Sequence, residues 1–124
     1  MAYSGKQPCN YSAKAGADLS GLQFYLLIMS ADNGVNITTT AGAAIAGVLQ
    51  NKPASGQHAV VCPLGITKVR VGGACSYGNT LTSAGSGWAA VAGSGNTAIG
   101  YVRHGCNSGG IAVAVIGASI GTLG

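Results

Sequence analysis

The sequence predicts an all-β protein: a compact small β-barrel or sandwich of about eight short strands with an extended N-terminal arm. Short apolar or alternating runs recur about every 8 to 12 residues, turn residues separate them, and no long stretch has the roughly 3.6-residue period of a helix. The 124 residues suffice for one domain with its own core. We therefore expect an extended arm over residues 1–12 and a single β domain over residues 13–124.

The composition indicates a folded chain with few charged residues. Hydrophobic residues make up 48% of the chain and charged residues only 6%. Disordered chains show the opposite balance, with little apolar and much charged sequence. A surface with so few charges tends to associate, so we expect copies of the chain or a partner to cover much of it.

The first predicted elements are the arm and a β-hairpin. Residues 1–12 contain two tyrosines and a proline without a regular pattern, and residues 13–22 allow a short helix. Residues 22–29 form an apolar run of strand length, and residues 35–40 alternate with β-branched side chains. Asn33-Gly34 between these runs is a strong hairpin signal.

Residues 44–61 predict a second hairpin, with a strand, a polar turn rich in Asn, Lys, Pro, Ser and Gly, and another strand that ends near Cys62. Residues 65–72 then alternate, so that Ile66, Lys68 and Arg70 share one side. A half-exposed strand would put these two bases in water. Further strands are expected near residues 80–82, 88–92, 98–103 and 111–116, with Gly-rich turns between them.

Six Lys/Arg residues against two Asp give a net charge of +4. The bases are scattered, at Lys6, Lys14, Lys52, Lys68, Arg70 and Arg103. Nucleic-acid binding would need them clustered, so we expect no nucleic-acid partner and, if the charge has a use, steering onto an acidic protein surface. The start lacks the apolar run of a signal peptide, and residues 111–116 are far shorter than the roughly 20 residues of a membrane span, so no membrane partner is expected.

One segment, residues 105–110, resembles the nucleophile segment of chymotrypsin-like serine proteases and would pair Ser108 with His58. That mechanism needs an acid between the histidine and the serine in the chain, and no Asp or Glu follows Asp32. Two Cys–His pairs, His58 with Cys62 and His104 with Cys106, would share a strand face but have no acid nearby to orient the imidazole.

The remaining chemistry-bearing residues predict neither catalysis nor a cofactor or metal site. Cys9, Cys62, Cys75 and Cys106 contain no CxxC pair, which argues against a zinc or redox motif. We expect mostly buried thiols, and their pairing after release from a reducing cytosol stays open. Asp18 and Asp32, the only acids, fit capping or turn positions better than paired-carboxylate catalysis. The Gly-x-Gly-x-x-Ala string at residues 93–98 lacks the βαβ context of a dinucleotide site.

Four segments occur in an order typical of one family. They are residues 13–20 with Gln23-Phe24, residues 47–53 with Gly56, residues 65–69 with residues 72–74, and residues 80–83 with Gly87 and Ile99-Gly100. Over about residues 13–116 the chain resembles the phage capsid cement (head decoration) proteins. The most specific segment is the family-marker turn, which consists of Gly47, Val48, Leu49, Gln50, Asn51, Lys52 and Pro53. Gln57, Asn79 and Gly109-Gly110 stand where such proteins often carry an acidic residue.

The resemblance implies a β domain bound in many copies to the outside of an icosahedral head. There it would clamp subunits of the major capsid protein as a homotrimer or another symmetric homo-oligomer, without a reaction or a cofactor. The virion is then its location, after synthesis in the host cytoplasm. For this role we expect contacts with the capsid from residues of the arm and just after it, namely Tyr3, Lys6, Pro8, Tyr11 and Lys14.

Two other functions stay open from the sequence. One is a β-sandwich binding module on the virion surface that holds host glycans or another cell-surface group. Its candidate residues are Tyr77, Trp88 and Tyr101, for which packing is the alternative role. The other is a Cys–His hydrolase, which would need a reactive thiol at Cys62 or Cys106.

Overall fold

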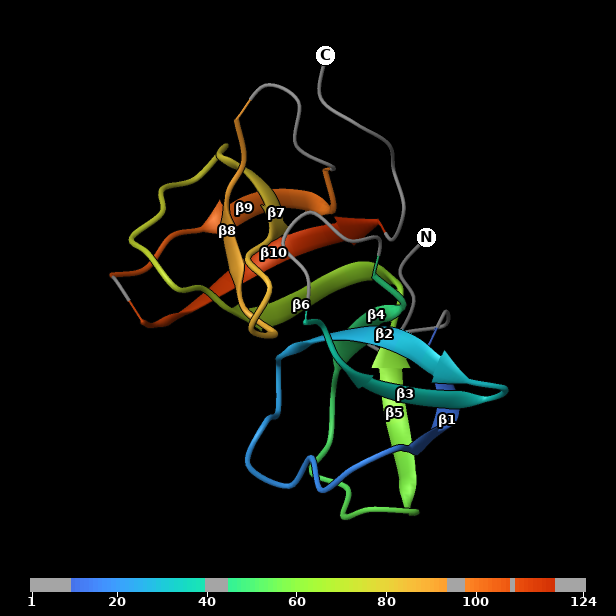
Figure 1. Ribbon diagram of the computed structural model, residues 1–124. Coiled ribbons are helices and arrows are strands. Elements are labelled where there is room, and N and C mark those ends of the chain that lie inside the picture. Colours follow the sequence, from blue (N-terminus) through green and yellow to red (C-terminus); the bar gives the residue numbers. More distant parts are fainter. Residues whose placement is uncertain (1–9, 40–44, 94–97, 108, 118–124) are drawn as a thin grey trace.

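The computed structural model describes residues 10–39, 45–93, 98–107 and 109–117. Within these ranges the chain forms ten β-strands and no helix, arranged as a five-stranded barrel beside a five-stranded sheet (Figure 1). The predicted all-β class is therefore confirmed. The described part of the chain contains no helix that is long and apolar enough to cross a membrane.

The barrel is built from the first half of the chain. Its strands are β1 (Tyr11–Ala15), β2 (Leu26–Ala31), β3 (Gly34–Ile37), β4 (Gly47–Leu49) and β5 (His58–Cys62). They follow the order β1-β3-β2-β4-β5, and pairing of β1 with β5 closes the barrel. β1 and β3 run parallel, and the other neighbours run antiparallel.

The second sheet follows directly, because only Pro63 separates β5 from β6. Its strands are β6 (Leu64–Arg70), β7 (Thr80–Ser83), β8 (Ala89–Val91), β9 (Gly100–His104) and β10 (Ile111–Gly117). They are ordered β6-β10-β9-β7-β8, and every neighbouring pair is antiparallel.

Two clusters of buried apolar side chains stabilise this arrangement. One fills the barrel and includes Leu27, Val35 and Leu49. In the other, side chains of the inner face of the second sheet, such as Val69 and Ile116, pack with residues from the barrel side. Those residues are Leu26, Ile45 and Val48. The second sheet therefore buries one face against the barrel and leaves the other uncovered by it.

Both predicted hairpins are confirmed. β2 pairs with β3 across Asp32 and Asn33, and Asn33 adopts the left-handed conformation (φ 53°) that asparagine tolerates better than most residues. β4 pairs with β5, with Val48 opposite Cys62. The alternation of residues 65–72 is confirmed too, since Ile66 and Lys68 are exposed and the intervening Thr67 and Val69 are buried. Of the two bases expected in water, only Lys68 is exposed, because Arg70 is half-buried with its guanidinium over the Trp88 ring.

Two expectations about the first elements were wrong. The short helix that residues 13–22 allow does not occur among the described residues, since β1 extends to Ala15 and turns follow it. The strand expected from residue 22 begins only at Leu26. Phe24 adopts a left-handed conformation (φ 71°), in which its N–H donates to the Leu49 carbonyl and its own carbonyl accepts from the Arg70 N–H. These bonds turn the chain between barrel and sheet before the strand can start.

Two residues of the family-marker turn, Gly47–Pro53, have a structural role in the β4–β5 hairpin. The Asn51 side chain spans the hairpin, donating to the His58 carbonyl (3.0 Å) and accepting from the Val60 N–H (2.9 Å). Gly47 has a φ of 154°, and a Cβ there would lie 2.7 Å from the Cys62 carbonyl oxygen. Residues of this turn therefore fix the β4–β5 connection, while Lys52 is exposed.

Candidate docking face

The outward face of the second sheet presents apolar side chains to solvent. Alternation along β6, β9 and β10 directs one set of residues toward the barrel and the other away from it. We call the second set the outer sheet face. It consists of Leu64, Ile66, Lys68, Arg70, Tyr101, Arg103, Ile111, Val113 and Val115.

Strand register brings these residues side by side. Ile66 is opposite Val115, and Val115 is opposite Tyr101 on the next strand, which makes an apolar row across three strands. Lys68 is opposite Val113 in the adjacent row. Directly opposed side chains on one face lie about 4.5–5.5 Å apart at Cβ, so the rows form a continuous surface.

The exposure of this face is unusual for a small domain. Leu64 is 56% exposed, Tyr101 50%, Ile111 44% and Ile66 39%. They are half of the large hydrophobic side chains that are exposed in the described part of the chain. Single exposed apolar residues need no explanation, but a contiguous group of them indicates a contact surface.

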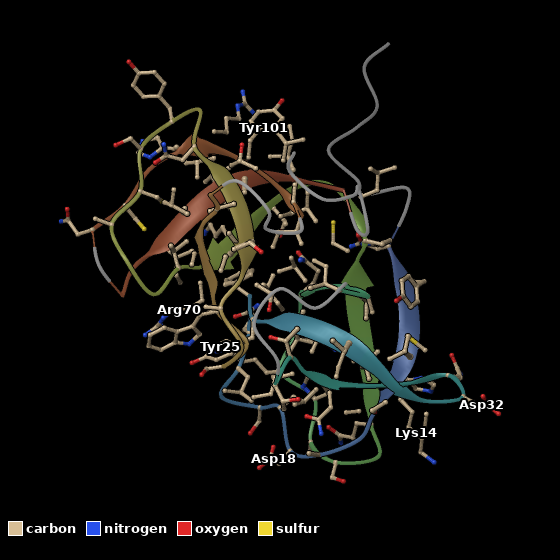
Figure 2. All side chains as sticks on the ribbon, turned by 45° about the horizontal axis from the view of Figure 1, so that its top comes forward. Lys14, Asp18, Tyr25, Asp32, Arg70 and Tyr101 are labelled. Atoms are coloured by element: carbon tan, nitrogen blue, oxygen red, sulfur yellow. The ribbon has the colours of Figure 1, made fainter. Side chains whose placement is uncertain are left out.

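The charge on and around the outer sheet face is positive. Lys68 and Arg103 belong to it, and the chain has no acid after Asp32. Asp18 and Asp32 both belong to the barrel half, and Figure 2 shows them at the opposite end of the molecule from Tyr101. A partner that complements this face would therefore combine apolar and acidic groups.

Two bases near the edge of the sheet are held by aromatic rings. The Lys68 ammonium lies 5.8 Å from the centre of the Phe24 ring, and the Arg70 guanidinium lies 5.6 Å from the centre of the Trp88 ring. Tyr25 meets Trp88 edge to face, with 6.4 Å between ring centres, and Figure 2 shows Tyr25 beside Arg70. Cation–π contacts of this kind fix the position of the charge along β6.

Of the contact residues expected in and beside the arm, the structure describes Tyr11 and Lys14. Tyr3, Lys6 and Pro8 are outside the described residues. Tyr11 lies in β1 opposite Val61, and its hydroxyl donates to the Ala46 carbonyl at 3.2 Å. Partial burial raises the pKa of this phenol.

Lys14 is exposed on β1 near the Asp32 turn, at the barrel end (Figure 2). The structure thus places Tyr11 and Lys14 on the barrel and not on the outer sheet face. That face was missed from the sequence as a unit, because it depends on which strands become neighbours. Its signal is the matching alternation of residues 64–70 and 111–117.

The candidate catalytic pairs are not assembled in the described residues. His58 is exposed at the start of β5 and Cys62 is buried at its end, about 13 Å away along the strand. The His104 ring nitrogen Nδ1 lies 3.1 Å from the Gly105 carbonyl, while Cys106 faces Cys75. Ser108 lies outside the described residues. Over the described ranges the structure has no ligand-sized pocket and no group of three potential metal ligands.

The candidate glycan-binding aromatics lie in different environments. Trp88 is half-buried and packs against Tyr25 and Arg70. Tyr77 is 82% exposed on the connection between β6 and β7, and Tyr101 belongs to the outer sheet face. Packing therefore accounts for Trp88.

Comparison with known proteins gives a structural likeness. No family model and no curated protein sequence matches the chain. Among solved structures it is similar to the N base of the head fiber gp8.5 of bacteriophage phi29, with a TM-score of 0.70 and 22% sequence identity. The match covers 93% of this chain and 97% of the other. At this identity the likeness shows that the two share a fold.

Proposed function

We propose that this chain is a non-enzymatic phage head protein that docks on the outside of the capsid through the outer sheet face and stabilises contacts between major capsid subunits. The observation that carries the proposal is that face: a contiguous apolar surface with bases and no acids. An adhesive surface is all that this role needs, since it involves no reaction.

Charge favours a capsid partner over a second copy at this face. Two outer sheet faces would bring Lys68 and Arg103 of one copy toward the same bases of the other, with no acid to compensate. An acidic and apolar patch on a capsid subunit would pair with both parts of the surface. Copies that form a trimer or another symmetric group on the head would do so through other surfaces.

The shared fold supports the broader part of the proposal, a structural role on the phage head. The similar protein is the base of a head fiber, that is, a part of a phage head structure. The segments that resemble capsid cement proteins include the Gly47–Pro53 turn, which fixes the β4–β5 hairpin here. The shared fold and the sequence resemblance both favour a structural protein of the head.

The proposed stabilisation follows from linkage. A protein that binds the expanded shell and not its dissociated subunits lowers the free energy of the shell by an amount that grows with occupancy. The binding free energies of many weak contacts, repeated by the symmetry of the head, then add to a large stabilisation of the shell. Moderate affinity per copy is sufficient.

The test is binding of purified protein to expanded heads of the cognate phage that lack it. We expect saturable binding at micromolar concentration and a higher temperature of DNA release from filled heads. Absence of binding would refute the proposal, and binding without a change in DNA release would refute the stabilising role. Binding to a glycan array instead of heads would favour the attachment function.

Residues 1–9 are proposed as a second contact, through Tyr3, Lys6 and Pro8. Their deletion should weaken docking more than folding, because β1 and its pairing with β5 are kept. Deletion through residue 12 would not separate the two effects, since Tyr11 and Ser12 belong to β1. Equal occupancy of heads by the shortened and full-length chains would contradict this part of the proposal.

A further inference from the structure

Two cysteines from distant parts of the chain face each other at the end of the second sheet. Cys75 and Cys106 form an isolated antiparallel bridge, in which each N–H donates to the carbonyl of the other residue, at 3.0 and 3.1 Å. Their sulfur atoms are 3.8 Å apart.

We propose that Cys75 and Cys106 are a disulfide-forming pair, which a small-molecule disulfide oxidises once the protein leaves a reducing cytosol. Residues that exchange both backbone hydrogen bonds have Cα atoms about 5.5 Å apart, within the range of roughly 4.4–6.8 Å that disulfides span. Both Cβ atoms of such a pair point to the same side of the strands. The sulfurs can therefore join by side-chain rotation with little movement of the backbone.

Two glycines allow this close approach. A Cβ on Gly105 would overlap the Cys75 carbonyl oxygen, and it would lie 2.9 Å from the Cα of Ser76. A Cβ on Gly110 would lie 3.2 Å from the Cys106 Cβ and 3.4 Å from its sulfur. On both sides of Cys106, a residue without a side chain thus lets the backbone lie close to the cysteine pair.

The chemistry is a pair of thiol–disulfide exchanges. Cys106 is the more exposed thiol, so its thiolate attacks one sulfur of the small-molecule disulfide, which releases one small thiolate and leaves a mixed disulfide. The Cys75 thiolate then attacks the Cys106 sulfur and releases the second small thiolate. The two protein thiols lose two electrons and two protons, and the small disulfide is reduced to two thiols.

The bond would fix one end of the outer sheet face. Cys106 lies on the connection between β9 and β10, between His104 and Ile111, and Cys75 lies on the connection between β6 and β7. The two cysteines are 31 positions apart in the chain. Closing a loop of this size restricts the unfolded chain, and we expect the melting temperature to rise by roughly 5–15 °C.

The test uses the full-length protein, treated with oxidised glutathione at pH 8, alkylated, and digested with trypsin without reduction. Because Arg70 and Arg103 are the last cleavage sites, residues 71–103 and 104–124 each carry one cysteine of the pair. We expect these two peptides to be recovered as one cross-linked species from monomeric protein, and reduction to lower the melting temperature. Alkylated Cys75 and Cys106, or cross-links only to Cys9 or Cys62 or between molecules, would overturn the proposal.

Matched glycine variants test the geometry. Gly105→Ala should slow formation of the bond at least about tenfold by separating the two strands. Gly73→Ala is the control, since a Cβ there meets no atom within 4 Å. Equal oxidation rates for the two variants would contradict the proposed pair. If Gly105→Ala does not fold, the cross-linked peptide in the unmodified sequence still decides the question.

Discussion

Replacing Leu64 and Ile66 by serine tests the outer sheet face directly. The two side chains lie on the edge strand β6 and are 56% and 39% exposed. Full burial of a Leu or Ile side chain contributes about 1.5–3 kcal/mol, so covering the exposed part on docking contributes about 1 kcal/mol at each position. Losing both contacts should weaken binding by about 2 kcal/mol, which is about 30-fold in Kd.

The control is a double variant that removes equally exposed apolar side chains from other surfaces. Met29→Ser with Val91→Ser fits, since these residues are 51% and 46% exposed, on β2 of the barrel and on the edge strand β8. Both double variants should lose similar folding stability, which thermal melting would verify.

The assay is titration of heads lacking the protein, followed by sedimentation and measurement of the bound fraction. We expect the Leu64/Ile66 double variant to bind about 30-fold more weakly and the Met29/Val91 variant to bind like the original. Equal affinities for the two double variants, or a loss confined to the Met29/Val91 variant, would refute the assignment of the docking face.

Three further predictions concern charge, the family-marker turn and the thiols. Arg103→Glu should weaken docking about tenfold and reduce its salt dependence, whereas Lys14→Glu at the barrel end should change neither; equal effects in the same titration would contradict the assignment. Asn51→Ala removes two hydrogen bonds across the β4–β5 hairpin and should cost about 1–3 kcal/mol in chemical unfolding, while the exposed Lys52→Ala should cost almost nothing; a neutral Asn51→Ala would contradict the structural role of the turn. Burial and the adjacent Cys75 thiol raise the pKa of the Cys106 thiol, so oxidation by glutathione disulfide should speed up about tenfold per pH unit above pH 7, and a pH-independent rate would contradict attack by the thiolate.

Local signals in the sequence were enough for the hairpins and the strand pattern. The Asn33 turn, the Asn51 turn and the alternation of residues 65–72 act through neighbouring residues, so the sequence reveals them. β1 was missed because its five residues are stabilised by pairing with β3 and β5, which lie about 20 and 45 positions away. Its alanines, buried in the barrel, could equally suit a short helix.

The outer sheet face depends on the pairing of strands that are far apart in the sequence, which the sequence alone does not reveal. Residues 64–70 and 111–117 each alternate, but only their pairing in register puts Ile66 beside Val115 and Tyr101. The Cys75–Cys106 pair also depends on folding, since the two cysteines are 31 positions apart in the sequence. What the sequence could show was the scarcity of charge, which predicted that part of the surface contacts another molecule.

The most direct measurement of the central claim is a cryo-EM map of heads saturated with the protein. The account predicts that β6, β10 and β9 face the shell, with Ile66, Val115 and Tyr101 against it and Lys68 and Arg103 beside acidic groups of the capsid. A map in which the protein sits on the shell by the barrel end, with Asp32 toward the capsid and the outer sheet face in solvent, would contradict it.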